Sequence, residues 1–445
     1  MTVCPDDSRT VRPCGEIRGT LSVPGDKSIS HRLAMLGALA EGTSEIAGYL
    51  TAEDCLNTLR AMEALGAKVA REGDRVLIQG TAGCLRPPAG VLDLGNSGTG
   101  IRLLAGLLAG QPFTSELTGD ASLRSRPMER IRKPLELMGA RVELLGKNGC
   151  APIRIHGAAL RGITYPLPVA SAQVKSCILL AGLFAEGDTT VIEPRATRDH
   201  TERLLRALGI SIDVAGGTIT VRGYGRGGPR IEARAWRVPG DFSSAAFWLA
   251  AAASRPGAEI CVENVGLNPR RTAFLDVLRR MGAEVRVAQS AVADQATAGE
   301  PVGAVTVRGG NLRGTEVAGE EIPNLIDELP LVAVLGAVAE GETRIRDAAE
   351  LRVKESDRIS AMATVLRAFG AENVKEFPDG LSVCGTARVK GGIMVDSRGD
   401  HRIAMAAAIL ALRAEQPVVV RGISCIATSY PTFWEDLGWV APANR

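Results

Sequence analysis

A helix that ends in glycine and leads into a strand recurs six times along the 445 residues of this chain. The copies stand 73, 70, 73, 88 and 68 residues apart, so the period is nearly constant. Glycine suits the end of a helix because it adopts the left-handed conformation at little cost. The six glycines are Gly66, Gly139, Gly209, Gly282, Gly370 and Gly438. We therefore expect six copies of one supersecondary unit.

A second helix repeats with the same period. It begins at a polar loop and continues as a run of Ala, Gly and Leu, as in "PGDKSISHRLAMLGALA" and "PGDFSSAAFWLAAAA". Such a helix is apolar nearly all round, which predicts that it is buried, whereas the glycine-ended helix is amphipathic. Each unit reads strand, helix, strand, helix and then one or two strands. The fold class predicted is α/β (α+β).

Two "VPGD" turns divide the chain. They begin at Val23 and Val238, 215 residues or three periods apart, so they stand at the same point of two related halves. Six units then split into two lobes of three. We expect one lobe from residues 1–22 plus 239–445 and the other from 23–238, with a hinge at the crossovers near 22–23 and 238–239.

Composition excludes several classes of partner. The chain has 52 Lys and Arg against 50 Asp and Glu, with no basic stripe, which argues against binding nucleic acid or a membrane surface. Nine cysteines without a CxxC pair favour reduced thiols, and neither a metal nor a redox centre is expected. The N-terminus resembles no targeting peptide and no apolar run reaches membrane length, so a cytoplasmic protein is expected.

Cations gather where helices begin. The dipole at a helix start repels them, so their presence there indicates that an anion is bound. Each cation alone is explained equally well as a solvated surface charge, but the whole set favours a polyanionic small molecule. The set is Lys27, Arg32, Arg126, Arg198, Lys354, Arg358 and Arg402.

Two carboxylates stand at similar places. Asp327 precedes an otherwise apolar helix, and Glu355 lies between Lys354 and Arg358. A salt bridge is the ordinary reading, and acid–base catalysis in a closed, charged site is the alternative. For His31 structural hydrogen bonding is favoured over catalysis, whereas for His401 both readings stay open.

The strings "PGDKSISHR", "LGNSGTG", "SRPM", "SAQ", "RVKESDR" and "GDHRIAM", in this order over nearly the whole chain, resemble the 5-enolpyruvylshikimate-3-phosphate synthase family. The resemblance implies two lobes of three βαβαββ units around buried parallel helices, an inside-out α/β barrel. It implies transfer of the enolpyruvyl group of phosphoenolpyruvate to the 5-hydroxyl of shikimate 3-phosphate, with release of phosphate. Neither a cofactor nor a metal is implied.

The same resemblance assigns residues to each role. Catalysis falls to Asp327, which accepts the hydroxyl proton, and to Glu355 and Lys27, which are candidates for proton transfer at the enol carbon. Phosphoenolpyruvate would be bound by Lys27, Gly98, Arg126, Gln173, Arg358 and Arg402. Shikimate 3-phosphate would be bound by Lys27, Ser28, Arg32, Ser171, Ala172, Gln173, Arg198, Asp327 and Lys354.

The chain departs from the plant and enteric members, which have Lys at Thr428, Ser at Ala172 and a Tyr near "TRDH". These departures resemble a divergent bacterial subclass. Glyphosate-tolerant members have Ala at the position of Gly98, so a glyphosate-sensitive enzyme is expected. A monomer is also expected. Two rivals remain. One is a UDP-N-acetylglucosamine enolpyruvyl transferase, whose catalytic Cys has no counterpart here, and the other is a catalytically inactive anion-binding relative.

Overall fold

The computed structural model describes residues 7–289, 295–386 and 388–444. The chain forms two compact units: unit 1 is Met1–Pro24, Gly240–Val292 and Pro301–Arg445, and unit 2 is Gly25–Pro239 with Ala293–Glu300. The crossovers at 24–25 and 239–240 stand beside the expected positions, 22–23 and 238–239. The expectation that all of 239–445 belongs to one lobe does not hold for the described residues 295–300, which are grouped with unit 2.

Unit 2 contains three four-stranded sheets, one for each repeat, in the orders β16-β3-β5-β4, β6-β7-β9-β8 and β11-β13-β15-β14. In each sheet the first pair is parallel and the other two pairs are antiparallel. A parallel pair, β10-β12, accompanies them. The strands are β3 (Thr43–Ala47), β4 (Lys68–Glu72), β5 (Arg75–Gln79), β6 (Leu92–Asp93), β7 (Thr114–Thr118), β8 (Arg141–Leu144), β9 (Ile153–His156), β10 (Leu160–Arg161), β11 (Thr164–Pro166), β12 (Ala185–Glu186), β13 (Thr189–Ile192), β14 (Ile212–Ala215), β15 (Thr218–Val221) and β16 (Ala235–Arg237).

Unit 1 contains the sheets β18-β19-β17-β2 and β20-β21-β23-β22 and the three-stranded sheet β1-β25-β24. The last sheet is completed by the N-terminal strand β1, which pairs antiparallel with β25. The described strands of both units form separate sheets rather than one closed barrel. The strands are β1 (Ser8–Val11), β2 (Arg18–Ser22), β17 (Glu259–Gly266), β18 (Glu284–Gln289), β19 (Val302–Arg308), β20 (Glu316–Val317), β21 (Glu342–Ile345), β22 (Glu372–Phe377), β23 (Gly380–Cys384), β24 (Met394–Asp396) and β25 (Val418–Arg421).

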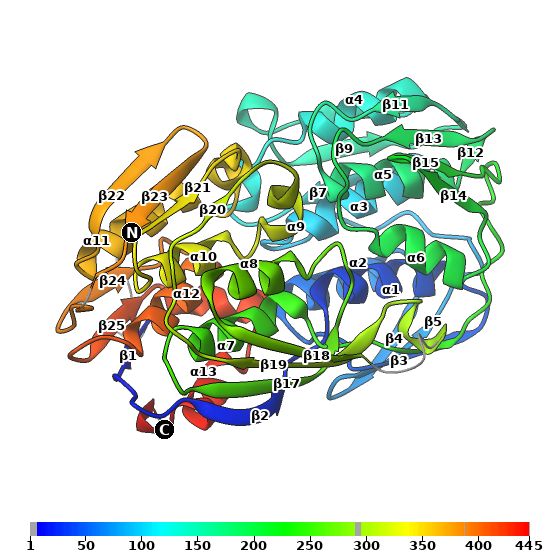
Figure 1. The fold of residues 1–445 in the computed structure, drawn as a ribbon. Helices are drawn as coiled ribbons and strands as arrows, with labels where there is room; N and C mark the ends of the chain where they lie inside the picture. Colours follow the sequence, from blue (N-terminus) through cyan, green and yellow to red (C-terminus); the bar gives the residue numbers. More distant parts are fainter. Residues whose placement is uncertain (1–6, 290–294, 387, 445) are drawn as a thin grey trace. The chain divides into compact units, whose positions relative to one another are not determined.

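Two strands pair in one unit although the helix that follows them belongs to the other. Strand β2 immediately precedes α1 (Lys27–Leu39) of unit 2, but it pairs in parallel with β17 of unit 1, beside which it is drawn in blue (Figure 1). Strand β16 precedes α7 (Phe242–Ala253) of unit 1, but it pairs with β3 of unit 2. The crossovers at 24–25 and 239–240 each directly follow one of these two strands.

The helices predicted to be buried form the core of each unit. All 12 residues of α7 are buried, as are 11 of the 13 residues of α1. In unit 2, α3 approaches α5 so closely that a Cβ on Gly106 would lie 2.2 Å from the backbone oxygen of Cys177. The other core helices are α3 (Gly98–Ala109), α5 (Ala172–Gly182), α10 (Leu329–Gly336) and α12 (His401–Ala411).

The remaining α-helices are amphipathic or short and cover the sheets or connect strands. They are α2 (Glu53–Ala64), α4 (Glu129–Met138), α6 (His200–Ala207), α8 (Ala273–Met281), α9 (Ile322–Leu325), α11 (Arg358–Ala368) and α13 (Phe433–Val440). Among the described residues, none of the helices has the length and apolar character needed to cross a membrane.

Five of the six repeat glycines have the expected left-handed conformation. Their φ angles are 108° at Gly66, 112° at Gly139, 77° at Gly209, 105° at Gly282 and 82° at Gly370. The sixth expectation is wrong, because Gly438 lies inside α13. No turn into a strand is needed there, since the N-terminal β1 supplies that strand of the last sheet.

The two "VPGD" turns form a reciprocal pair. The amide of Asp26 donates to the carbonyl oxygen of Pro239, and the amide of Asp241 donates to that of Pro24, both at 2.8 Å. Each aspartate also caps the helix that follows, α1 or α7. Close backbone approach requires glycine, because a Cβ on Gly25 would lie 1.9 Å from the oxygen of Gly48. The part that the turns share is therefore structural.

After these turns the two sequences differ in what their side chains do. In the second copy Phe242, Ala245 and Phe247 are buried in the core of unit 1, as expected. The first copy has Lys27 and Arg32 of α1 where the second has Phe242 and Phe247, and Ser28 where the second has Ser243.

Candidate active site

The start of α1 holds a cation against a carboxylate. Lys27 is the first residue of the helix, and its Nζ lies 3.1 Å from Oδ2 of Asp54, a largely buried side chain of α2. Asp26 caps the helix by accepting from the amide of Ile29. Ser28, half-buried in the first turn, accepts a hydrogen bond at its backbone oxygen from Arg32 Nη1, 2.8 Å away.

Arg32 is buried, with 4% of its surface exposed, although as a charged residue near a helix start it could equally have been a solvated surface charge. Its Nε donates to Thr201 Oγ1 at 2.8 Å, and its Nη2 donates to Ser176 Oγ at 2.7 Å. Burial lowers the pKa of Arg32 to about 10. The negative charge of Glu202 is the main effect that opposes this shift, and the positive charge of the nearby Arg198 lowers the pKa further. The structure therefore brings Arg32 and Arg198 into one electrostatic environment, in which a bound anion would relieve the repulsion between them.

A second group of predicted residues gathers at the start of α3. Arg126, 5% exposed, donates to Asn96 Oδ1 and to Ser122 Oγ. A Cβ on Gly98 would lie 2.9 Å from Arg126 Nη1, so glycine leaves room for this guanidinium. The same Cβ would lie 3.3 Å from Nη1 of Arg102, a cation that the motifs did not reveal.

The start of α5 supplies the "SAQ" residues. Ser171 caps the helix with its Oγ, which accepts from the amide of Val174 at 3.4 Å, and Ala172 is its first residue. Gln173 joins the Gly98 group, because its Oε1 accepts from Arg102 and its Nε2 donates to Thr99 Oγ1 at 3.0 Å.

His31 is structural, as favoured from the sequence. Its ring is fully buried between Thr58 Oγ1, 2.7 Å from Nδ1, and Ser97 Oγ, 3.3 Å from Nε2. Burial and the charges of Lys27 and Arg32 hold its pKa well below the usual range. The neutral ring joins the starts of α1 and α3, and so relates the two groups of predicted residues in unit 2.

The predicted residues of unit 1 surround one guanidinium. Arg358, 1% exposed, donates from Nη2 to Glu355 Oε2 at 2.5 Å and from Nη1 to Asp327 Oδ1 at 3.3 Å. Its Nε donates to Asp400 Oδ2 at 2.9 Å. Desolvation lowers the pKa of Arg358, but the three carboxylates outweigh it and raise that pKa above its usual value. Arg358 thus stays charged and fixed between the two candidate acid–base groups.

Further cations lie close to these carboxylates in the chain or in space. Arg402 is 8% exposed, and its Nε lies 3.5 Å from Asp327 Oδ1. Lys354 is half-buried and directly precedes Glu355. His401, the open case from the sequence, is the buried first residue of α12 beside Arg402.

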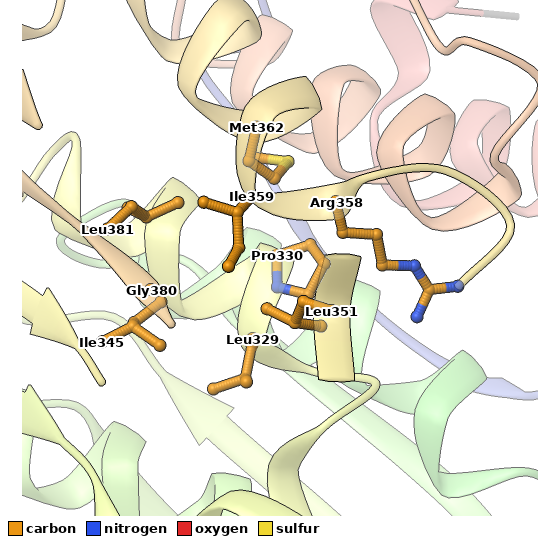
Figure 2. Close-up of a pocket in the computed structure, with 9 residues that line it drawn as sticks. All are labelled: Leu329, Pro330, Ile345, Leu351, Arg358, Ile359, Met362, Gly380 and Leu381. Atoms are coloured by element: carbon orange, nitrogen blue, oxygen red, sulfur yellow. The ribbon is translucent and has the colours of Figure 1, made fainter. Parts of the chain in front are cut away.

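The apolar side of this cluster is well packed. A cavity of about 10 Å³, barely the room of one water molecule, lies among apolar side chains including Leu329, Leu351 and Ile359. Figure 2 shows the guanidinium of Arg358 directed away from them. The arginine stem therefore rests on a firm apolar support, while its charged end reaches the carboxylates.

A buried polar network lies behind Asp327. Its neighbour Glu328 is fully buried and accepts a hydrogen bond from Ser243 Oγ. Arg271 Nη2 donates to that Ser243 Oγ at 2.6 Å and lies 3.5 Å from Asp241 Oδ1. The second "VPGD" turn is therefore connected through side chains to the helix start that carries Asp327.

Several participants were not found from the sequence. Asp400 lies within the motif "GDHRIAM", which was read for its cation, and its position before a helix was the only available signal. Asp54 and Arg102 lie inside helices in sequences with no recognisable motif, so no signal marked them as site residues. Across the described residues, no group of three or more His, Cys, Asp or Glu side chains is arranged to hold a metal.

Solved structures give the class of protein. The chain is similar to an enolpyruvyl transferase of Streptomyces tendae, NikO, with a TM-score of 0.77 over 97% of this chain and 96% of that one. Their sequence identity is 20%, so this likeness concerns the fold alone. The fold is that of the enolpyruvyl transferases, as expected. An EPSP synthase of Acinetobacter baumannii is similar with a TM-score of 0.84, 43% identity and 98% coverage of both chains.

The sequence comparisons identify the family. The profile described as EPSP synthase (3-phosphoshikimate 1-carboxyvinyltransferase) matches residues 11–437. A 3-phosphoshikimate 1-carboxyvinyltransferase of Akkermansia muciniphila is 53% identical over 95% of this chain and 97% of its own length. One of Pelotomaculum thermopropionicum is 51% identical over 95% and 96%. The chain belongs to the EPSP synthase family.

Proposed function

We propose that this chain transfers the enolpyruvyl group of phosphoenolpyruvate to the 5-hydroxyl of shikimate 3-phosphate and releases phosphate, in the shikimate pathway. Membership of the family gives the reaction. The environment of Arg358 supports the assignment of catalytic roles to Asp327 and Glu355. Two carboxylates, Asp327 and Glu355, bond to one buried guanidinium. Addition to an anionic substrate requires acid–base groups held beside fixed cations.

The reaction requires proton transfer at two atoms. In the addition, the 5-hydroxyl oxygen bonds to C2 of phosphoenolpyruvate and loses its proton, while the methylene carbon C3 gains one. In the elimination, C3 loses a proton and the C2–O bond to phosphate breaks, with the electron pair leaving on phosphate. We assign the hydroxyl proton to Asp327. Glu355 and Lys27 are the candidates for the proton at C3.

The cations divide between the two substrates. Arginine forms paired hydrogen bonds with carboxylate and phosphate, and it stays charged at every physiological pH. Phosphoenolpyruvate is assigned to Lys27, Gly98, Arg126, Gln173, Arg358 and Arg402. Shikimate 3-phosphate is assigned to Lys27, Ser28, Arg32, Ser171, Ala172, Gln173, Arg198, Asp327 and Lys354. Ala172 offers only its backbone, because its methyl group has no hydrogen-bonding atom.

Release of phosphate from phosphoenolpyruvate, measured with and without shikimate 3-phosphate, tests the function. We expect release only when both substrates are present. Release without the second substrate rejects the proposal. Release with UDP-N-acetylglucosamine in place of shikimate 3-phosphate favours the rival enolpyruvyl transferase, and no release with either acceptor indicates an inactive anion-binding relative.

Glyphosate is the expected inhibitor, because Gly98 leaves space beside Arg126 that an alanine would fill. Turnover that is undiminished at glyphosate concentrations far above that of phosphoenolpyruvate would rule out this assignment.

We further propose that the enzyme is a monomer whose hinge lies at the two crossovers. Because one pair of substrates needs residues from both units, the chain should compact when shikimate 3-phosphate and glyphosate bind. An unchanged radius of gyration in small-angle scattering would contradict this.

A further inference from the structure

The fourth repeat is longer than the others, with 88 residues between Gly282 and Gly370. The extra residues lie between the last two strands of that repeat. Strand β18 ends at Gln289 and β19 begins at Val302, whereas β4 ends at Glu72 and β5 begins at Arg75. Both β18 and β19 belong to unit 1, yet the connection between them contributes Ala293–Glu300 to unit 2. The chain thus enters unit 2 a second time.

Residues 297–300 form a tight turn. The amide of Glu300 donates to the carbonyl oxygen of Thr297 at 3.1 Å, and φ is 58° at Ala298 and 73° at Gly299. Two left-handed residues in succession reverse the chain sharply. Alanine is disfavoured in this conformation, but its side chain is buried in the hydrophobic core of unit 2. The turn is therefore held in place by packing.

The turn brings a carboxylate to the start of α6. Glu300 Oε1 lies 2.6 Å from His200 Nδ1, and both side chains are 2% exposed. Arg203, one turn further along α6, donates from Nη1 to the carbonyl oxygen of Gly299 at 3.0 Å. Its Nε lies 3.8 Å from Glu300 Oε2. A buried carboxylate with two partners on one helical turn fixes that turn strongly.

This turn of α6 is connected to residues proposed to bind shikimate 3-phosphate. Thr201, next to His200, accepts from Arg32 Nε at 2.8 Å and donates to Ser176 Oγ at 2.7 Å. Arg198 lies two residues before the helix. The charge of Glu300 also raises the pKa of Arg32 against the effect of burial. Glu300 is therefore close enough to influence this cation.

We propose that Glu300 is a positioning residue for shikimate 3-phosphate: it fixes the first turn of α6, and through it Arg198 and the Thr201 contact of Arg32. This inference rests on the proposed function, which supplies the substrate. It assigns residues 297–300 of the fourth repeat to support of substrate binding rather than only to joining two strands. Binding of phosphoenolpyruvate should be affected much less, because none of the residues assigned to it lies on α6.

Steady-state kinetics of Glu300→Gln and His200→Asn, with both substrates varied, test the proposal. We expect each variant to raise KM for shikimate 3-phosphate about tenfold, within the range reported for substitutions in coupled networks. KM for phosphoenolpyruvate should stay within about twofold. The double variant should be no worse than Glu300→Gln alone, because that variant already removes the ion pair with His200. Glu284→Gln removes a matched, exposed glutamate of β18 that pairs with Arg286, and should behave as wild type.

Two results would overturn the inference. One is a lower midpoint of thermal unfolding in Glu300→Gln with an unchanged KM for shikimate 3-phosphate, which would make the connection a structural anchor only. The other is an equal rise in both KM values. If Glu300→Gln does not fold, His200→Asn, which keeps the carboxylate, decides between the same outcomes. Wild-type enzyme that shows no release of phosphate dependent on shikimate 3-phosphate rejects the proposed function instead, before any variant is compared.

Discussion

Nε of Arg358 lies 2.9 Å from Oδ2 of Asp400, and both side chains are buried, the first 1% and the second 0% exposed. Asp400 also accepts from the backbone amide of Arg402 with its Oδ1, at 2.9 Å. One carboxylate thus caps α12 and fixes the arginine of α11. Because its Nε is bound on the buried side, the two terminal nitrogens of Arg358 are directed to Asp327 and Glu355.

Asp400→Asn should therefore weaken both folding and catalysis. The amide keeps the shape but loses the charge, and a hydrogen bond to a charged group contributes about 1.5–3 kcal/mol. We expect the free energy of unfolding in urea to fall by about that amount. Loss of alignment of Arg358 should lower kcat/KM for phosphoenolpyruvate by about 10- to 100-fold. Asp213→Asn, on an exposed position of β14, is the matched control. Wild-type kcat/KM in Asp400→Asn would contradict the positioning role.

Asp327→Asn should remove the general base without removing the hydrogen-bonding shape of the side chain. General acid–base groups contribute about 10²- to 10⁴-fold to rate, so kcat should fall within that range. KM for shikimate 3-phosphate should rise less, because the amide oxygen still accepts from Arg358 or a substrate hydroxyl. Rapid-quench measurement of a single turnover separates the chemical step from product release. A variant with the wild-type rate of that step would exclude Asp327 as the base. Glu342→Gln, exposed on β21, serves as the control.

The repeat pattern predicted much of the fold because helix ends and buried helices are local properties of the sequence. Five glycines took the left-handed conformation that their places required. The pairing partners of β2 and β16, which are β17 and β3, were not predicted, because local residue patterns do not say which strand a given strand pairs with. The failure at Gly438 has the same origin, since β1 comes from the other end of the chain.

The candidate site was predicted in its residue types but not in its pairings. Lys27 and Arg358 were read as cations awaiting an anion, whereas the structure gives them Asp54 and three carboxylates. Asp54, Asp327 and Asp400 come from distant segments of the chain, so sequence spacing carries no information about these pairings, whereas Glu355 stands three residues before Arg358 and was visible beside it. The connection that carries Glu300 is indicated in the sequence only by the longer spacing of the fourth repeat.

Gly98→Ala should affect phosphoenolpyruvate and glyphosate differently. The new Cβ would lie 2.9 Å from Arg126 Nη1, the far end of a flexible side chain that is able to shift. We expect KM for phosphoenolpyruvate to rise about tenfold. We expect the glyphosate concentration that halves activity to rise more. Gly90→Ala adds a methyl group where no atom other than those of its chain neighbours lies within 4 Å, and should leave both unchanged. Equal sensitivity of Gly98→Ala and wild type to glyphosate would show that this position does not crowd the inhibitor.

His31 should make the folded enzyme sensitive to acid. Burial, Lys27 and Arg32 hold its folded-state pKa well below the 6.5 of an exposed histidine. As pH falls below about 6.5, the unfolded chain binds a proton at this residue while the folded chain does not, so stability is lost by up to about 1.4 kcal/mol per pH unit. The loss continues until pH reaches the folded-state pKa. His31→Gln removes this contribution, so wild type should lose stability relative to the variant between pH 6 and pH 5. Urea unfolding of both proteins at each pH measures the difference, in which the titration of other groups cancels. Parallel pH dependences would mean that His31 is protonated in the folded enzyme too.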